Sequence, residues 1–217
     1  DISGATIGID LLGGTRAAID GLDIDDPGAF AVRTQGSNDV YLNGLDVDDS
    51  GLGANQNYGF YTTSTSSGTQ EISNSDFNGL GTAVYLTNDV STTISGTVIS
   101  NSDVGFRVGS QSSANHFVDT MTLNNNNIGV QADGTGELTM NDVDISSTTS
   151  DVEISDSSVV YFLDGTVDQA KVSVPSTVTG SFGRVQTAGD INAGGRVFEQ
   201  NTSVIDHATA MAIVFGG

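Results

Sequence analysis

Two tyrosines and an arginine in this sequence are spaced so that they can form one binding surface. Tyr61, Tyr85 and Arg107 each stand between two inward-facing residues of a short segment that recurs about every 22 residues. If these segments are stacked strands, the three side chains lie in successive strands on one exposed face, because alternate residues of a strand point to opposite sides. Two aromatic rings and a guanidinium can stack on sugar rings and hydrogen-bond to hydroxyls or to an acidic sugar. We therefore predict a ligand-binding site here; the alternative is an aromatic ladder that only stabilises the sheet. The full predicted column is Asp10, Ala31, Tyr61, Tyr85, Arg107, Gln131, Glu153 and Ser173.

A set of aspartates is the second group that can do chemistry. Asp23, Asp46 and Asp76 occupy one position of the repeat, and Asp26 and Asp49 occupy another one close by. Carboxylates in neighbouring coils, about 5 Å apart, repel one another by roughly 1 kcal/mol per pair in water. Ca²⁺, which takes about six to eight oxygen ligands, would relieve this repulsion. The alternative is exposed acids screened by salt, and the lack of an EF-hand loop or a glycine-aspartate nonapeptide favours it. The sequence thus predicts no cofactor, with calcium as the alternative.

The elements that position these side chains are visible as an internal repeat. A hexad of apolar, polar, small, variable, variable and apolar residues recurs along the chain, as in Ile19–Ile24 and Leu42–Val47. Its third position is mostly Gly, Asn or Asp, the residues that tolerate the unusual backbone angles of tight turns. The hexads begin at Ile2, Ile19, Leu42, Ile72, Ile94, Val118, Met140 and Phe162.

A second strand follows each hexad, with two inward residues on either side of one outward residue. These pairs are Ile9/Leu11, Phe30/Val32, Phe60/Thr62, Val84/Leu86, Phe106/Val108, Val130/Ala132, Val152/Ile154 and Val172/Val174. Short strands, polar turns and a coil of about 22 residues exclude a helical solenoid and suit three sheets around an apolar core. Polar residues after each hexad, such as Asn124 and Asn125, are expected to stack between coils and to bond turn backbone groups. We predict an all-β fold, a right-handed single-stranded parallel β-helix of about eight to nine coils, of which residues 1–174 form the regular domain.

The repeat resembles that of a known superfamily. The segment Ile99-Ser-Asn-Ser-Asp-Val-Gly-Phe-Arg-Val108 looks like the parallel β-helix repeat of the pectate-lyase-like superfamily, especially its NosD-like members, and the resemblance covers about residues 2–174. It implies this fold, and it raises the alternative of a polysaccharide lyase or hydrolase. Such lyases use Arg or Lys beside Ca²⁺-binding acids, and the related hydrolases use clustered aspartates with a nearby His-Gly.

The catalytic features of those enzymes are poorly matched in this chain. Phe and Ala follow His116 and His207, and lysine is nearly absent. Asp48-Asp49 resembles the hydrolase pair, but Asp25-Asp26 repeats it one coil earlier, which indicates a structural repeat. Arg107 with the acids is the one lyase-like constellation. The sequence therefore favours a non-catalytic protein, and no catalytic residue is predicted.

Three segments depart from the repeat. Residues 50–57 are predicted to protrude as a Gly/Asn loop, and residues 110–115 form a second excursion. Residues 175–217 are predicted to form irregular final coils, a cap or an assembly strand. The apolar segment 208–215 is expected to cover the end of the helix, to pair with another subunit or to join a further domain, because an open sheet edge is otherwise prone to association.

Composition narrows the class of partner and the environment. The chain of 217 residues carries 27 acidic and 6 basic residues, for a formal net charge of −21, and has no cysteine. The electric field of so much negative charge repels nucleic acid and anionic membranes. At molar salt, however, this field is screened within about 3 Å. The composition resembles that of extreme halophiles. No apolar stretch is long enough to span a bilayer. The chain begins with Asp1 rather than Met, so we expect a processed product or a piece of a longer protein.

These observations lead to one function and one alternative. We expect a non-catalytic extracellular structural or recognition module of a cell-surface or virion protein (a fibre, spike or decoration protein). It is expected to bind a glycan through the Tyr61 face and to assemble as a homo-oligomer through its C-terminal strand. The alternative is the polysaccharide lyase or hydrolase described above.

Overall fold

In a computed structural model the chain folds as a parallel β-solenoid, which confirms the predicted all-β parallel β-helix. The structure describes residues 1–36, 38–49, 57–63, 68–87, 90–155, 158–168 and 171–173, and the strand residues 181–182, 198–199 and 202–203. These residues contain no α-helix. The chain divides into two compact units, Asp1–Arg184 and Val185–Gly217. The predicted boundary between residues 174 and 175 lies outside the described residues and stays a prediction.

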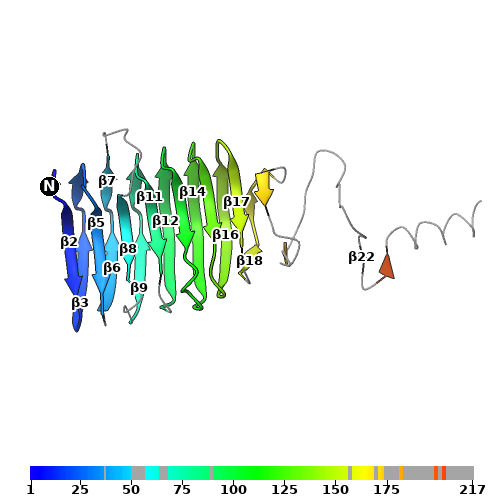
Figure 1. The fold of residues 1–217 in the computed structure, drawn as a ribbon, viewed down its shortest axis with the longest axis horizontal. Coiled ribbons are helices and arrows are strands. Elements are labelled where there is room, and N and C mark those ends of the chain that lie inside the picture. The colour runs from blue at the N-terminus through cyan, green and yellow to red at the C-terminus, as the bar shows by residue number, and fades with distance from the viewer. Residues whose placement is uncertain are drawn as a thin grey trace, which may run out of the picture. The chain divides into compact units, whose positions relative to one another are not determined.

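Each coil of the first unit runs through three faces, whose strands stack side by side in Figure 1. The first face holds β3 (Thr15–Asp20), β6 (Asn38–Asn43), β9 (Gln70–Ser73), the first halves of β12 (Thr92–Ser100), β14 (His116–Asn124) and β16 (Glu137–Ser146), then β18 (Val159–Phe162) and β21 (Ser181–Phe182). The second face holds β1 (Ile2–Ser3), β4 (Asp23–Asp25), β7 (Asp46–Asp48), β10 (Asp76–Asn78), the second halves of β12, β14 and β16, and β19 (Gly165–Thr166). The third face holds β2 (Ile7–Leu12), β5 (Phe30–Gln35), β8 (Tyr58–Thr62), β11 (Thr82–Leu86), β13 (Val104–Val108), β15 (Ile128–Ala132), β17 (Ser150–Ile154) and β20 (Val172–Ser173).

The first two faces belong to one 13-stranded sheet because β12, β14 and β16 continue around the corner between them, whereas the third face is a separate 8-stranded sheet. In the second unit the described strands are β22 (Phe198–Glu199) and β23 (Thr202–Ser203), which pair antiparallel.

The solenoid makes about seven turns, slightly fewer than the eight to nine coils predicted. The sequence count assigned one coil to each hexad, whereas the eight strands of the third face enclose seven turns. The predicted ninth coil falls on residues after 174, where β21 is the one described strand that continues the solenoid.

The corner between the first and second faces explains the third position of the hexad. The backbone there is left-handed, with φ of 63° at Gly21, 48° at Asn74 and 56° at Gly96. Thr120, with φ of 53°, and Asp142, with φ of 51°, take the same left-handed conformation although they are not glycine. This confirms the predicted turn chemistry and shows that Thr120, a β-branched residue, holds a conformation that such residues rarely adopt.

The interior is a narrow apolar column. Phe60, Phe77 and Phe106 have no exposed surface, and burial of each such side chain stabilises the fold by roughly 1.5–3 kcal/mol. Space beside this column is so tight that the second residue of most third-face strands is small. A Cβ atom added to Gly129 would lie 2.5 Å from Cγ2 of Ile145.

The corner between the second and third faces carries the predicted polar ladder. Asn78 Nδ2 donates to Asp48 Oδ1 at 2.8 Å, and Asn101 and Asn125 continue this ladder, each donating to the Asn one coil before it at 2.7 Å. Inside the corner, Asn126 is fully buried and donates to the carbonyl oxygen of Ile99 at 3.1 Å. The stacking predicted from the residues after each hexad is thereby confirmed.

The predicted register is wrong in the first two coils. Ile2, not Ile7, pairs with Ile24, and Ile7 pairs with Phe30 on the third face. The segment Ile2–Ile7 matches the hexad pattern by coincidence, because it spans the second corner rather than the first. In the second coil the inward residues of the third face are Val32 and Thr34, not Phe30 and Val32. Asp10 therefore pairs with Arg33, and Arg33 rather than Ala31 belongs to the outward column.

Candidate functional site

The third face brings the three predicted ligand-binding residues together. Tyr61 pairs with Tyr85, and Tyr85 pairs with Arg107, so the three lie in successive strands as predicted. Their side chains are half-buried and point outward. Arg33 pairs with Tyr61 from the other side. The outward column therefore has an arginine at each end of a tyrosine pair, a symmetry that the sequence-based register did not reveal.

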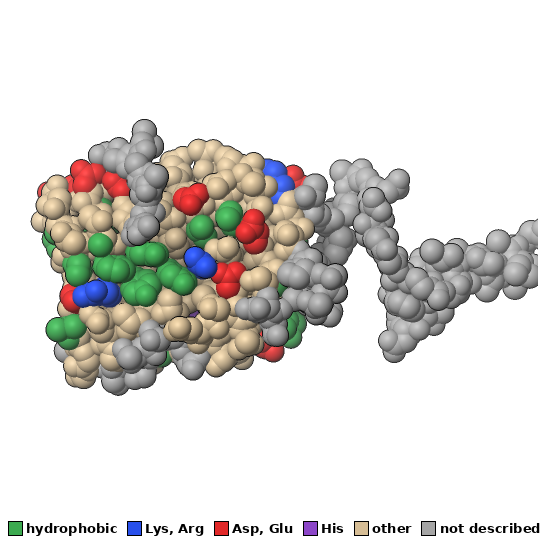
Figure 2. Space-filling model, in the orientation of Figure 1, with side chains coloured by type: hydrophobic (Ala, Val, Ile, Leu, Met, Phe, Trp, Pro, Cys, Tyr) green, Lys and Arg blue, Asp and Glu red, His purple; other side chains and the backbone are tan. Residues whose placement is uncertain are grey.

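Two further rings extend the tyrosine pair into a surface that we call the aromatic platform, made of Phe30, Tyr58, Tyr61 and Tyr85. The Phe30 ring stacks on Tyr58 at 5.4 Å between centroids and contacts Tyr61 at 5.0 Å. The Tyr85 ring lies 5.7 Å from that of Tyr58 and 5.5 Å from that of Tyr61. All four are half-buried, and hydrophobic side chains with basic side chains beside them are visible in Figure 2. The mutual contacts fix the rings, so that a flat ligand meets a preformed surface.

Phe30 and Tyr58 were not predicted as site residues. The sequence pattern placed Phe30 in the core, as the partner of Val32, whereas the structure places it outward at the first position of β5. The buried partner of Val32 is instead the polar Thr34. Phe30 and Tyr58 are paired in neighbouring strands.

Each arginine of the column stacks on a platform ring and is fixed by a carboxylate. The Arg33 guanidinium lies 5.1 Å from the centroid of Phe30, and that of Arg107 lies 4.9 Å from the centroid of Tyr85. Such cation–π contacts contribute about 0.5–1 kcal/mol at exposed sites. They also hold each guanidinium flat beside the platform.

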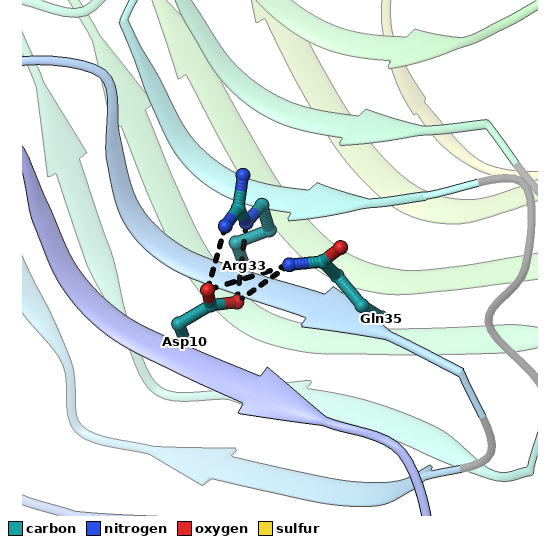
Figure 3. Close-up of polar contacts among 3 residues, drawn as sticks. All are labelled: Asp10, Arg33 and Gln35. Carbon is teal, nitrogen blue, oxygen red and sulfur yellow. Dashed lines mark hydrogen bonds and ion pairs between the residues drawn. The ribbon is translucent and has the colours of Figure 1, made fainter.

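The carboxylate partner of Arg33 is Asp10 (Figure 3). Arg33 on β5 donates through Nε to Oδ1 of Asp10 at 3.1 Å and through Nη2 to Oδ2 at 2.6 Å. Gln35 donates to Asp10 Oδ1 at 3.0 Å. The hydrogen bond from Arg33 is the main cause that lowers the pKa of Asp10 below its usual value, so this carboxylate stays ionised and paired at neutral pH.

The partner of Arg107 is Asp133, which follows β15. Nε and Nη2 of Arg107 donate to Asp133 Oδ2 at 3.1 Å and 2.8 Å, and Ser155 donates to Asp133 Oδ1 at 2.7 Å. Burial is the largest cause that raises the pKa of the nearby Tyr85 phenol above its usual value. The platform therefore lies between two ion pairs, and the Tyr85 phenol within it stays neutral at neutral pH.

A hollow of about 210 Å³ adjoins the platform where β8, β11 and β13 end. Tyr61 and Tyr85 form part of its wall, and Thr87, Ser110 and Gln111 contribute polar groups. Gly109 is needed here because a Cβ atom on it would lie 2.8 Å from the Tyr85 ring. Ser110 and Gln111 belong to the predicted excursion 110–115, so one of the two predicted loops lines the hollow. Of the other predicted loop, residues 50–56 lie outside the described residues, whereas Asn57 is buried rather than protruding.

The candidate calcium residues lie on and beside the second face. Asp46 pairs with Asp23 on one side and with Asp76 on the other, so the predicted column exists and is exposed. Burial, followed by the charges of Asp46 and Asp48, raises the pKa of Asp76 above its usual value. The contribution of the two neighbouring charges is the repulsion expected from the sequence, and it is smaller than that of burial.

The two remaining candidate calcium residues lie in the turns that follow. Asp26 helps to line a hollow of about 190 Å³ together with Ser3, Asp25 and Asp48. Asp49 accepts a hydrogen bond from the Asn57 side chain. Among the described residues, no group of three or more His, Cys, Asp or Glu side chains is arranged to hold a metal ion. Calcium binding stays a prediction.

A serine–histidine pair was not predicted. The Ser112 hydroxyl lies 2.9 Å from Nε2 of His116, a pairing of the type that nucleophilic enzymes use. Both side chains are buried, however, with 0% and 2% of their surfaces exposed, so a polymer cannot reach them. Burial also lowers the pKa of His116 from 6.5 to about 4. This pair therefore anchors the loop after β13 rather than providing a nucleophile.

Comparison of the chain with protein-family models, with curated proteins and with solved structures finds no match. The structure thus supports a parallel β-solenoid, whereas no comparison assigns the chain to the pectate-lyase-like superfamily. In the part of the chain that the structure describes, no helix is long and apolar enough to cross a bilayer. The predicted assembly segment 208–215 lies outside the described residues.

Proposed function

We propose that this chain is a non-catalytic extracellular recognition module of a cell-surface or virion protein, and that it binds carbohydrate through the aromatic platform. The observation that carries the proposal is the set of four mutually packed, outward-facing rings in three successive strands. Sugar rings present C–H faces that stack on aromatic rings, and rings that are already ordered lose little entropy on binding. The four aromatic rings stand on paired strands of the third face, which hold them in place.

The paired state of Arg107 supports binding over catalysis. In a lyase-like mechanism the arginine must face the sugar, yet the Arg107 guanidinium directs both Nε and Nη2 to the carboxylate of Asp133. The high net negative charge supports an extracellular place in high salt, where such a surface is screened.

The test is binding of soluble polysaccharides to the wild type, to Tyr61→Ala and to Tyr85→Ala, measured by affinity electrophoresis and calorimetry. Loss of one stacked ring is expected to weaken binding about fivefold to tenfold, which corresponds to about 1–1.4 kcal/mol. Tyr41→Ala is the matched control, because Tyr41 is also half-buried and carries an arginine, Arg16, over its ring, but lies on the first face. Circular dichroism checks that all variants fold.

Three outcomes contradict this part of the proposal. The first is that no polysaccharide binds, and the second is that Tyr41→Ala weakens binding as much as Tyr61→Ala. The third is the appearance of new reducing ends or of unsaturated products during incubation, which would instead support the polysaccharide lyase or hydrolase.

The proposal includes assembly through the C-terminal segment. The apolar segment 208–215 in a lysine-poor chain suits pairing with another copy, which would cover an otherwise open sheet edge. Light scattering in about 2 M salt, where surface charges are screened, is expected to show a trimer or a larger assembly. Deletion of residues 208–217 is expected to convert it to a monomer. A wild-type monomer would contradict the assembly without affecting the proposed glycan binding.

A further inference from the structure

We infer that the aromatic platform accepts uncharged glycans and excludes polyanionic ones, an inference that rests on the proposed carbohydrate binding. On sequence alone, the arginine beside the tyrosines was compatible with an acidic sugar as well as with neutral hydroxyls. The side-chain pairing now distinguishes these two classes of ligand.

Both arginines at the platform are already occupied by carboxylates of the chain itself. Arg33 and Asp10 form a bidentate pair, with each carboxylate oxygen accepting from a different guanidinium nitrogen. In the second pair, Arg107 directs Nε and Nη2 to Asp133. Each guanidinium has five N–H donors and directs two of them to its acid. A carboxylate or sulfate on a ligand would therefore bind beside Asp10 or Asp133 or displace it, and in either case it would lie close to that carboxylate.

Supporting hydrogen bonds make that displacement costly. Gln35 and Ser155 donate to the two acids and hold them toward their arginines. Asp133 is well shielded, with 16% of its side chain exposed against 35% for Arg107. A partly buried carboxylate that loses its cation is strongly destabilised. The geometry therefore favours retention of both pairs when a ligand binds.

The rest of the surface adds no free positive charge at this site. In the outward column after Arg107 come Gln131 and then the acidic Glu153. The whole chain carries a formal net charge of −21. A polyanion thus meets repulsion at long range and finds no available cation among the described residues of the column.

Groups suited to neutral sugars are present beside the rings. The hollow next to Tyr61 and Tyr85 exposes the side chains of Ser110 and Gln111, which can donate and accept hydrogen bonds. A sugar that stacks on the two rings can place its hydroxyls in this hollow. Hydroxyl-rich, uncharged polysaccharides match both parts of the surface.

The experiment compares two polymers with the same backbone, neutral hydroxyethyl cellulose and anionic carboxymethyl cellulose. Binding is measured at the lowest salt concentration at which circular dichroism shows each variant folded. We expect the wild type to bind the neutral polymer at least about tenfold more tightly. Asp133→Asn frees Arg107, so this variant is expected to gain at least about tenfold in affinity for the anionic polymer. A dextran and carboxymethyl dextran pair repeats the comparison on a second backbone.

The matched control is Asp119→Asn, which makes the same change in net charge on the first face, where Asp119 pairs with Asn141. This variant is expected to keep the preference of the wild type. The inference is overturned if the wild type binds the anionic polymers as tightly as the neutral ones. It is also overturned if both substitutions change the preference equally. Failure of the wild type to bind any of the four polymers would instead refute the proposed carbohydrate binding.

Discussion

The stability of this solenoid is expected to depend on pH through the buried His116. His116 has 2% of its surface exposed, and burial holds the pKa of its imidazole at about 4 against 6.5 in the unfolded chain. Its Nε2 atom is paired with the Ser112 hydroxyl. The folded protein therefore keeps this imidazole neutral over a pH range in which the unfolded chain protonates it.

The direction and size of the effect follow from that difference. Above pH 6.5 the imidazole is neutral in both states and costs nothing. As pH falls from 6.5 toward 4, only the unfolded chain takes up the proton, so the free energy of unfolding decreases. Each tenfold difference in proton affinity between the two states corresponds to about 1.4 kcal/mol. Because the pKa of His116 falls from 6.5 to about 4, the free energy of unfolding decreases by up to about 3 kcal/mol near pH 4.

The assay is urea unfolding followed by circular dichroism between pH 7.5 and pH 4.5 at constant high salt, for the wild type and for His116→Gln. A glutamine amide is neutral throughout and can still donate to Ser112. The difference in unfolding free energy between the two proteins is expected to vary with pH, since the wild type alone loses stability through this residue. His207 is present in both proteins and cancels. Parallel pH profiles for the two proteins would refute the reasoning that burial keeps His116 neutral.

Three substitutions test other parts of the structure by their effect on the free energy of unfolding. Thr120→Asn is expected to stabilise the protein by about 0.5–1 kcal/mol, because Asn tolerates the left-handed backbone better and Asn74 occupies the equivalent corner; a loss of stability in denaturant titration would contradict this. Gly129→Ala is expected to destabilise it by about 1–3 kcal/mol, because the added Cβ atom overlaps Ile145; a neutral result in thermal unfolding would show that the interior is looser than described. Asp76→Asn is expected to stabilise the protein by roughly 0.5 kcal/mol at low salt and by less in molar salt, since it removes a repelled carboxylate; equal stabilisation at both salt concentrations would rule out charge repulsion as the cause.

The regular part of the fold was predictable because its coils are nearly equal in length. Phe77, Ile99, Leu123 and Ile145 were aligned correctly from the sequence, and the structure pairs them in successive strands. Each has the same inward position, so the hydrophobic period and the turn residues agree on one register. The prediction that Tyr61, Tyr85 and Arg107 share one face followed from this register.

The early coils were mispredicted because apolar residues five apart occur at two different corners. Ile2 and Ile7 span the corner between the second and third faces, whereas Ile19 and Ile24 span the corner between the first and second. Sequence spacing alone does not distinguish these corners. Phe30 was placed inside the core for a separate reason: the buried partner of Val32 is the polar Thr34, whereas the pattern took the apolar Phe30 as that partner.

The partner of Arg107 was beyond the reach of the repeat pattern. Asp133 lies just after β15, outside the strand positions that the register aligns, and reaches Arg107 only because of side-chain direction in the turn. The repeat therefore predicted which residues share a face but not which charges neutralise one another. The proposed preference for uncharged ligands rests on that second fact.

The most direct test of the aromatic platform uses the fluorescence of the chain itself. The sequence has five tyrosines and no tryptophan, and Tyr58, Tyr61 and Tyr85 belong to the platform. Titration of the wild type with hydroxyethyl cellulose is expected to give a saturable change in tyrosine emission, which Tyr61→Ala weakens and Tyr41→Ala does not. Emission that stays constant up to saturating polymer, or that changes equally in both variants, would contradict glycan binding at this platform.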